Sequence, residues 1–132
     1  MRVAIRYPVI CIFICVWASS RSKIPTYYFR HTFNMPSKEG LRVLSCRLIV
    51  DDGAIVYLNG IEVFRVNIPS GGVEFDTRAS DLGDEDTQHT FEVNPDWIHV
   101  GSNVLAAEVH QVSGTSSDIR WQLEMKGTLA LG

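Results

Sequence analysis

Cysteine is scarce in this sequence, and its few cysteines are unevenly placed. Of the three, Cys11 and Cys15 lie within the first twenty residues, and only Cys46 lies in the rest of the chain. An intrachain disulfide is therefore excluded for the part beyond Ser20. A chain of 132 residues can bury roughly two thirds of its unfolded surface, so a hydrophobic core alone can stabilise one domain.

Positive charge is also in short supply. The chain carries 12 Lys and Arg against 15 Asp and Glu, a formal net charge of -3 at pH 7. Nucleic-acid binding needs a basic face that neutralises phosphates, and no stripe of Lys or Arg is present. Nucleic acids and other polyanions are therefore poor candidates for partners.

Catalytic and metal-site motifs are missing as well. The sequence contains no Gly-x-Ser-x-Gly, no phosphate-binding Gly-x-x-x-x-Gly-Lys, no Cys-x-x-Cys and no dinucleotide-binding fingerprint. Its four histidines lack His-x-His and His-x-x-x-His spacing, so a zinc or two-metal catalytic centre is not indicated. We expect a protein without catalytic activity of its own.

The first twenty residues differ in kind from the rest. Two arginines precede an apolar run from Val9 to Ala18, and two serines follow it. This order is typical of a secretory signal peptide, and the run is shorter than the ~20 residues of a membrane-spanning helix. We predict a leader over 1–20 and a secreted module over 21–132. A retained leader that directs the chain to an organelle or a membrane surface, and a buried first strand or helix, are the alternatives.

Beyond the leader, apolar residues alternate with polar ones and do not recur at helical spacing. Such alternation indicates strands with one face toward a core. Cys46 and Trp121 alternate with apolar neighbours and are expected to be buried. About seven to nine short antiparallel strands predict an all-β sandwich or barrel. The strands are expected at 27–34, 41–50, 54–58, 61–66, 73–75, 90–93, 104–112 and 119–131.

Two short motifs predict tight turns. Asp51-Asp52-Gly53 and Asn59-Gly60 contain residues that tolerate the positive φ of short hairpins, so each is expected to join two paired strands. Asn94 directly precedes Pro95, an order typical of a helical turn with an asparagine cap.

A set of motifs in a fixed order resembles a known family. The motifs are Tyr28-Phe29-Arg30, the stretch from Asp51 to Arg65, Gly101-Ser102-Asn103-Val104-Leu105-Ala106, and Glu108-Val109-His110-Gln111 with Ser116-Ser117-Asp118. Together they resemble the galactose-binding-domain-like jelly roll over residues 27–127. The resemblance implies an antiparallel β-sandwich of jelly-roll type, a module that is appended to secreted metallophosphoesterases and, in a looser form, to glycoside hydrolases.

The paired aspartates resemble a second family over residues 50–64 alone. That family is a lectin barrel of adhesins, in which two aspartates hold calcium beside a sugar. Calcium favours clustered carboxylates, so Asp51 and Asp52 are candidate ligands, with ordinary turn chemistry as the alternative. A further acidic stretch lacks the spacing of an EF-hand loop, which favours a solvated loop; it comprises Asp76, Asp81, Asp84, Glu85 and Asp86.

Candidate ligand-binding residues follow from how proteins hold sugars. Aromatic rings stack on pyranose faces while carboxylates and amides bond the hydroxyls. Trp97, in a Pro-Asp-Trp turn, is the first candidate, followed by Tyr27 and Tyr57. Glu108 and His110 are expected on one strand face, as a hydrogen-bonded structural pair or as binding residues.

We therefore predict a non-catalytic binding or attachment module. Its expected ligand is a carbohydrate at a loop end of the sandwich, with calcium as a candidate structural ion. The alternatives are an accessory subunit that packs against a larger protein, and an accessory domain of an extracellular metallophosphoesterase.

Overall fold

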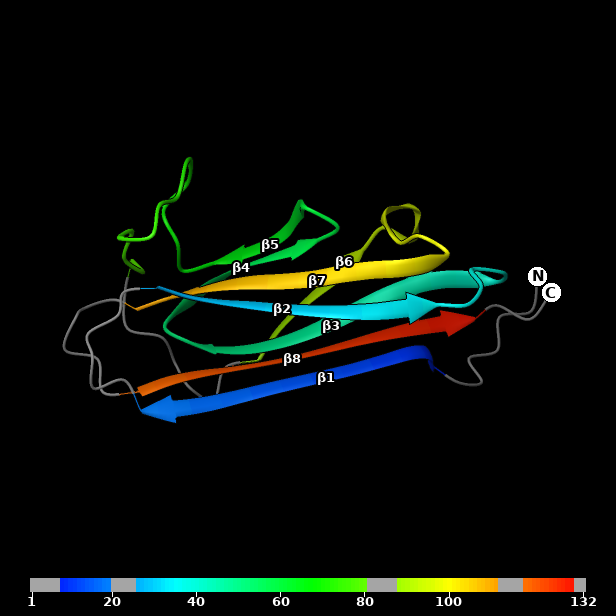
Figure 1. Cartoon of the computed structure of the whole chain (residues 1–132), viewed down its shortest axis with the longest axis horizontal. Coiled ribbons are helices and arrows are strands. Elements are labelled where there is room, and N and C mark those ends of the chain that lie inside the picture. The colour runs from blue at the N-terminus through cyan, green and yellow to red at the C-terminus, as the bar shows by residue number, and fades with distance from the viewer. Residues whose placement is uncertain (1–7, 20–25, 81–87, 112–117, 130–132) are drawn as a thin grey trace.

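Eight strands and one short helical turn form in this chain. The computed structural model describes residues 8–19, 26–80, 88–111 and 118–129, and Figure 1 shows the elements in chain order. Their bounds are β1 Pro8–Ser19, β2 Thr26–Met35, β3 Leu41–Asp51, β4 Gly53–Leu58, β5 Ile61–Val66, β6 His89–Val93, η1 Pro95–Trp97, β7 Gly101–His110 and β8 Asp118–Leu129.

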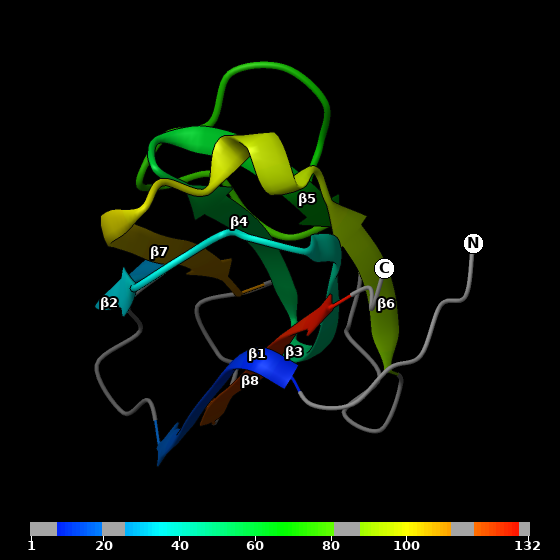
Figure 2. The same ribbon diagram turned by 90° about the vertical axis from the view of Figure 1, so that its right-hand side faces the viewer.

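The strands form two four-stranded sheets that face each other (Figures 1 and 2). The first sheet has the order β1-β8-β3-β6 and the second sheet has the order β2-β7-β4-β5. Every neighbouring pair is antiparallel. This order is that of an eight-stranded jelly roll, which is built from two Greek keys. The predicted all-β sandwich of jelly-roll type is confirmed.

The hydrophobic core lies between the two sheets. Phe29 of β2 packs on Trp121 of β8 with ring centroids 5.0 Å apart. Phe64 of β5 stacks on Phe91 of β6 at 4.3 Å, so aromatic contacts join the sheets on both sides. Trp121 and Cys46 are buried, as predicted. Burial raises the pKa of the Cys46 thiol to about 12, which keeps it protonated and unreactive.

The Asp51-Asp52-Gly53 motif joins the two sheets. β3 pairs with β6 and β8, whereas β4 pairs with β5 and β7, so the predicted hairpin at this motif is wrong. The reason is that every residue from Leu48 to Val56 is buried, and a run buried on both faces belongs inside the sandwich and not at an exposed turn. Gly53 is required because a Cβ there would lie 2.7 Å from the Asn67 carbonyl oxygen.

The other two turn motifs form as predicted. Asn59-Gly60 joins β4 to β5 in an antiparallel hairpin, with φ angles of 50° and 83° that suit a two-residue turn. Asn94 caps η1 by accepting a hydrogen bond from the Asp96 N–H, and Pro95 follows in the first turn.

Residues 73–75, which alternation predicts as a strand, have irregular backbone. The Glu74 N–H donates to the Thr77 hydroxyl at 2.9 Å, so it bonds within its own loop and not to a neighbouring strand. Local polar side chains of this kind compete with sheet hydrogen bonds.

The apolar run of the first twenty residues lies in the first sheet. β1 pairs with β8, from Cys11 opposite Lys126 to Ser19 opposite Asp118. The run is therefore an edge strand in the structure, and removal of residues 1–20 from the natural protein stays a prediction. In the described part of the chain, no helix is long and apolar enough to cross a membrane.

Candidate functional site

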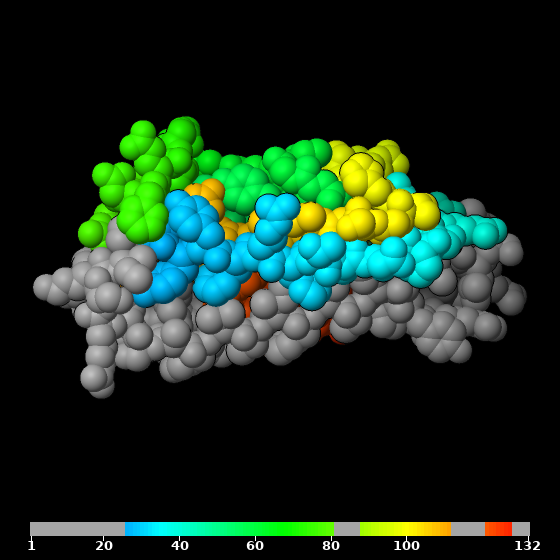
Figure 3. All heavy atoms as spheres, in the orientation of Figure 1, coloured from blue at the N-terminus to red at the C-terminus, as the bar shows by residue number. Residues whose placement is uncertain are grey.

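Residues 67–80, which we call the covering segment, lie over one end of the outer face of the second sheet. The segment is the green loop that rises at the left ends of β4 and β5 in Figure 1, and its atoms form the green protrusion at the upper left of Figure 3. Arg65 of β5 donates from Nη1 to the carbonyl oxygens of Pro69 and Gly71, at 2.5 and 3.1 Å. Its Nη2 atom pairs with Glu62 at 2.6 Å. One arginine thus ties the segment to the sheet.

Apolar contacts fill the space below the covering segment. Ile68 and Ala79 pack on Ile55 of β4 in a small cluster of buried residues. The Ala79 N–H also donates to the Gln111 carbonyl oxygen at 3.0 Å, just beyond the end of β7. The covering segment therefore forms a fixed wall on the sheet.

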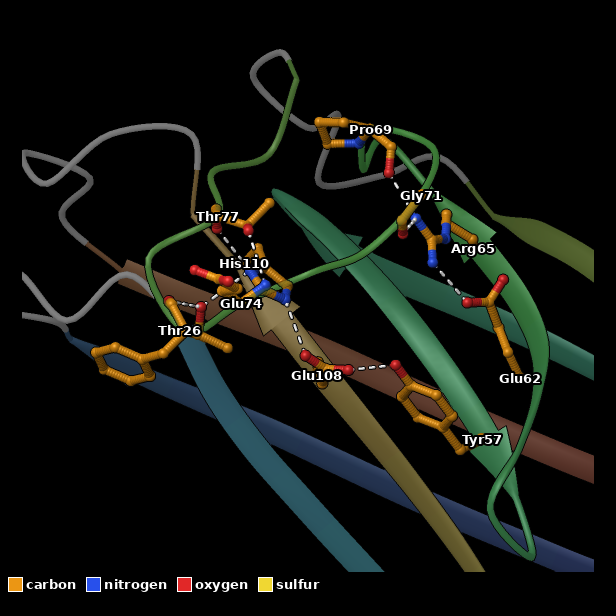
Figure 4. A network of polar contacts seen from close by, with 11 residues as sticks. Thr26, Tyr57, Glu62, Arg65, Pro69, Gly71, Glu74, Thr77, Glu108 and His110 are labelled. Atoms are coloured by element: carbon orange, nitrogen blue, oxygen red, sulfur yellow. Dashed lines mark hydrogen bonds and ion pairs between the residues drawn. The ribbon is translucent and has the colours of Figure 1, made fainter.

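A buried histidine also links the covering segment to the sheet (Figure 4). His110 is 0% exposed, and its Nδ1 atom lies 2.6 Å from the Thr77 carbonyl oxygen and 2.9 Å from the Thr26 hydroxyl. Because a carbonyl oxygen only accepts, Nδ1 carries the proton of this bond. The Thr26 hydroxyl donates to the Phe75 carbonyl oxygen. Thr26 of β2 and His110 of β7 thus contact each other, and each also contacts a backbone carbonyl oxygen of the covering segment.

Glu108 is contacted at both carboxylate oxygens. Its Oε1 atom lies 3.3 Å from Nε2 of His110, and its Oε2 atom accepts a hydrogen bond from the Tyr57 hydroxyl of β4. Burial, and then the bond to Glu108, raise the pKa of Tyr57, so this hydroxyl remains a donor. Figure 4 shows the resulting chain of contacts, which holds the carboxylate in place.

A hollow of about 340 Å³ opens beside this carboxylate, on the outer face of the second sheet. Strand register sets its walls: Ala106 of β7 lies between Arg30 of β2 and Tyr57 of β4, and Tyr28 lies opposite Glu108. Because the Ala106 side chain is a single methyl group, it forms the bottom of the hollow between the longer side chains of Arg30 and Tyr57. We call this hollow, lined by Tyr28, Arg30, Tyr57, Ala106 and Glu108, the sheet groove.

Tyr28 gives the sheet groove an exposed aromatic wall. Tyr28 is 60% exposed, and Phe75 of the covering segment is 52% exposed. The two rings stack with centroids 6.3 Å apart and planes 24° apart. Together they form an aromatic platform at the side of the groove.

The structure brings together three of the five residues that the sequence singles out for ligand binding. Glu108 and His110 share one strand face and contact each other, and Tyr57 bonds Glu108 from the next strand. Tyr27 instead packs against the hydrophobic core.

Sequence reasoning missed Tyr28 and Arg30. The alternation of β2 leaves both exposed, whereas the inward-facing Tyr27 and Phe29 are half-buried. The signal that could have found them is the register of β2 against β7, which sets Tyr28 opposite Glu108. That register is set over more than seventy residues of chain and is not written in either strand alone.

Trp97, the candidate that the sequence ranks first, lies at the other end of the second sheet. Asn59 donates from Nδ2 to the Trp97 carbonyl oxygen and to Oδ1 of the buried Asn103, both at 2.9 Å. Asn103 stands near the start of β7, and roughly 17 Å of strand separates it from Glu108 in the sheet groove. Trp97 and the sheet groove are therefore separate places on the molecule.

Asp51 and Asp52 are buried where the chain passes between the sheets. The Asn67 side chain donates to the Asp52 carbonyl oxygen at 3.1 Å. Within the described residues, no group of three or more His, Cys, Asp or Glu could hold a metal ion. Calcium binding stays a prediction. In the acidic stretch Asp76 is exposed, and residues 81–87 lie outside the described part.

Comparison with known proteins yields no relative: no family model, no curated protein and no solved structure matches this chain. The geometry of the sheet groove is therefore the basis for a function. Its exposed ring, its fixed carboxylate and its arginine are groups that can stack on a small polar molecule and form hydrogen bonds with it.

Proposed function

We propose that this chain is a non-catalytic module that binds a carbohydrate in the sheet groove. One observation carries the proposal: the exposed ring of Tyr28 stands beside Glu108, a carboxylate that the protein itself fixes. Pyranose rings present apolar C–H faces to aromatic rings and hydroxyls to carboxylates. The resemblance to galactose-binding-like modules supports the same class of ligand. The proposed binding place is the outer face of the second sheet, whereas the sequence alone suggests a loop end of the sandwich.

The dimensions of the sheet groove suit a sugar. Its volume of about 340 Å³ is at the lower end of the ~300–1,000 Å³ of small-molecule sites. Arg30 and Tyr57 stand on strands that are separated by β7, which places their backbones roughly 10 Å apart. A single sugar ring fits between such walls with its edge over Ala106.

The state of the two titratable residues supports binding without catalysis. A general acid or base must reach the proton that it transfers, directly or through one water. His110 is 0% exposed and its ring nitrogens face Thr77, Thr26 and Glu108. Glu108 in turn is held by Tyr57. The pair is built to position a hydrogen-bond acceptor.

The test compares two aromatic residues at opposite ends of the second sheet. Glycan-array binding identifies a ligand, and titration calorimetry then measures its affinity for the wild type, Tyr28→Ala and Trp97→Ala. We expect Tyr28→Ala to weaken binding about ten-fold or more, because loss of ring contact and burial exceeds about 1.4 kcal/mol. Trp97→Ala is expected to leave the affinity unchanged.

The opposite pattern would move the ligand to the loop end around Trp97. Absence of binding to every glycan, with and without Ca²⁺, would overturn the proposal. Loss of fold is excluded as a cause by the circular dichroism spectrum of each variant, and Tyr28 is exposed enough for substitution to leave the core intact.

We also propose that the module acts outside the cell, on the basis of the leader-like residues 1–20. N-terminal sequencing of the natural protein tests this: a first residue near Ser19 supports export, and an intact Met1 contradicts a cut leader.

A further inference from the structure

We infer that the sheet groove selects an acidic sugar, one whose carboxylate is bound by Arg30. The inference rests on the proposed function and goes further by naming the chemistry of the ligand. It follows from a difference between the two charged residues of the groove.

Glu108 is already occupied within the protein. Tyr57 contacts one of its oxygens and His110 the other. The hydrogen bond from Tyr57 therefore already uses one oxygen of Glu108 before any ligand arrives. The carboxylate keeps lone pairs that can accept from a sugar hydroxyl.

Arg30 is in the opposite situation. In the part of the chain that the structure describes, it makes no hydrogen bond and no ion pair, whereas Arg47 and Arg65 both pair with glutamates. It is exposed on the surface and lines the groove. A guanidinium has five N–H donors in a planar fork that fits a carboxylate with two parallel bonds. Most of the hydrogen-bond donors that the groove leaves without a partner among the described residues therefore belong to the positively charged Arg30.

The positions of Arg30 and Tyr28 match the shape of a uronic acid. They are two residues apart on the same face of β2, which separates their Cα atoms by roughly 7 Å. In a uronic acid the carboxylate is attached directly to the pyranose ring. A ring that stacks on Tyr28 therefore carries its carboxylate within reach of the Arg30 side chain.

The overall charge of the chain narrows the ligand further. A net charge of -3 repels a dense polyanion at long range. A local contact between one guanidinium and one carboxylate acts at short range and tolerates this repulsion. The ligand class is therefore a sugar with one carboxylate on the ring and not a densely sulfated or phosphorylated polymer.

The experiment uses matched ligands in which the carboxylate of the sugar ring is present, esterified or replaced by a neutral group. Short oligomers of galacturonic, glucuronic and mannuronic acid are titrated into the full chain, beside their methyl esters and the matching neutral oligomers. We expect one acid to bind about ten-fold more tightly than its methyl ester, the effect of one charge-assisted hydrogen-bonded pair.

Two arginine variants show whether Arg30 is responsible. Arg30→Gln is expected to bring the affinity for the acid down to that for the ester and to leave the ester affinity unchanged. Arg47→Gln, on the outer face of the first sheet, is the matched control and is expected to change neither affinity.

The outcomes separate the two proposals. Equal affinity for acid and ester in the wild type, or an equal loss of both in Arg30→Gln, would overturn the selection of acidic sugars, while binding of neutral oligomers would keep the proposed function. If no oligomer of either kind binds, both proposals are wrong.

Discussion

The outer faces of the two sheets carry hollows of opposite character. The hollow on the first sheet is the larger, about 560 Å³, with Arg47, Glu124 and Lys126 among its lining residues. These charges pair with one another: Arg47 and Lys126 each lie 2.9 Å from an oxygen of Glu124. The sheet groove is smaller, about 340 Å³, but it has an exposed tyrosine and an arginine without a partner among the described residues.

The comparison teaches that the volume of a hollow and the pairing of its charged groups are independent of each other. On the first sheet the three charged side chains Arg47, Glu124 and Lys126 satisfy one another. On the second sheet the buried His110 connects Thr77 to Glu108 through polar contacts. Tyr28 and Arg30 take no part in these contacts. The four predictions below test this contrast, and each uses the free energy of unfolding in urea as its measure.

The largest effect is expected for His110→Ala, a loss of about 3 kcal/mol, because the Thr77 carbonyl oxygen loses its buried donor and the removed ring leaves a cavity at a fully buried position. The matched variant on the first sheet is Glu124→Ala, which removes two exposed ion pairs and is expected to lose at most about 1 kcal/mol. Similar losses for the two variants would break the contrast between the faces.

The next effect concerns how closely the covering segment approaches the second sheet. Gly53→Ala is expected to lose about 2 kcal/mol, because the added Cβ would lie 2.7 Å from the Asn67 carbonyl oxygen and 2.8 Å from Ile68 Cδ1. Gly72→Ala, within the covering segment, is the control, since a Cβ there meets nothing within 4 Å. A stable Gly53→Ala protein would show that the segment is not packed against the strand.

Tyr57→Phe is expected to lose about 1 kcal/mol at pH 8, because the hydrogen bond to Glu108 is removed. The pKa of Tyr57 is raised in the folded protein, so its contribution is complete below the unfolded value of about 10 and declines at higher pH. The difference in stability between wild type and variant should therefore narrow between pH 9 and pH 11. A difference that stays constant over this range contradicts the raised pKa.

The smallest effect is expected for Glu124→Gln, about 0.5 kcal/mol at pH 7. Hydrogen bonds from Lys126 and Arg47 lower the pKa of Glu124. A lowered pKa gives stability that is present above the unfolded value and is lost as the pH falls through the folded one. The variant should therefore match the wild type at pH 2.5, and also at pH 7 in 1 M salt. A loss that salt does not reduce would mean that the pair is not an exposed one.

The fold was predictable because apolar and polar residues alternate along most strands, and because Asn59-Gly60 is typical of a two-residue hairpin turn. The link at Asp51-Asp52-Gly53 was not, because turn residues do not reveal whether the next strand joins the same sheet. That choice depends on burial of both sides of the run from Leu48 to Val56, which is a tertiary property.

The candidate site was predictable only within one strand. Glu108 and His110 are two residues apart, so alternation alone places them on one face. The contact between Tyr57 and Glu108 joins residues 51 apart in the sequence, and no local pattern specifies it. The polar, glycine-containing covering segment likewise gave no sign that the carbonyl oxygens of Phe75 and Thr77 would meet Thr26 and His110.

Arg65 and His110 hold the covering segment through bonds to its own carbonyl oxygens, those of Pro69, Gly71 and Thr77. The conformational entropy of this loop is therefore lost when the chain folds, and not at the moment of complex formation. A ligand of the proposed kind would meet a wall that is already ordered, so its association would need no slow loop closure and would be governed by diffusion and orientation.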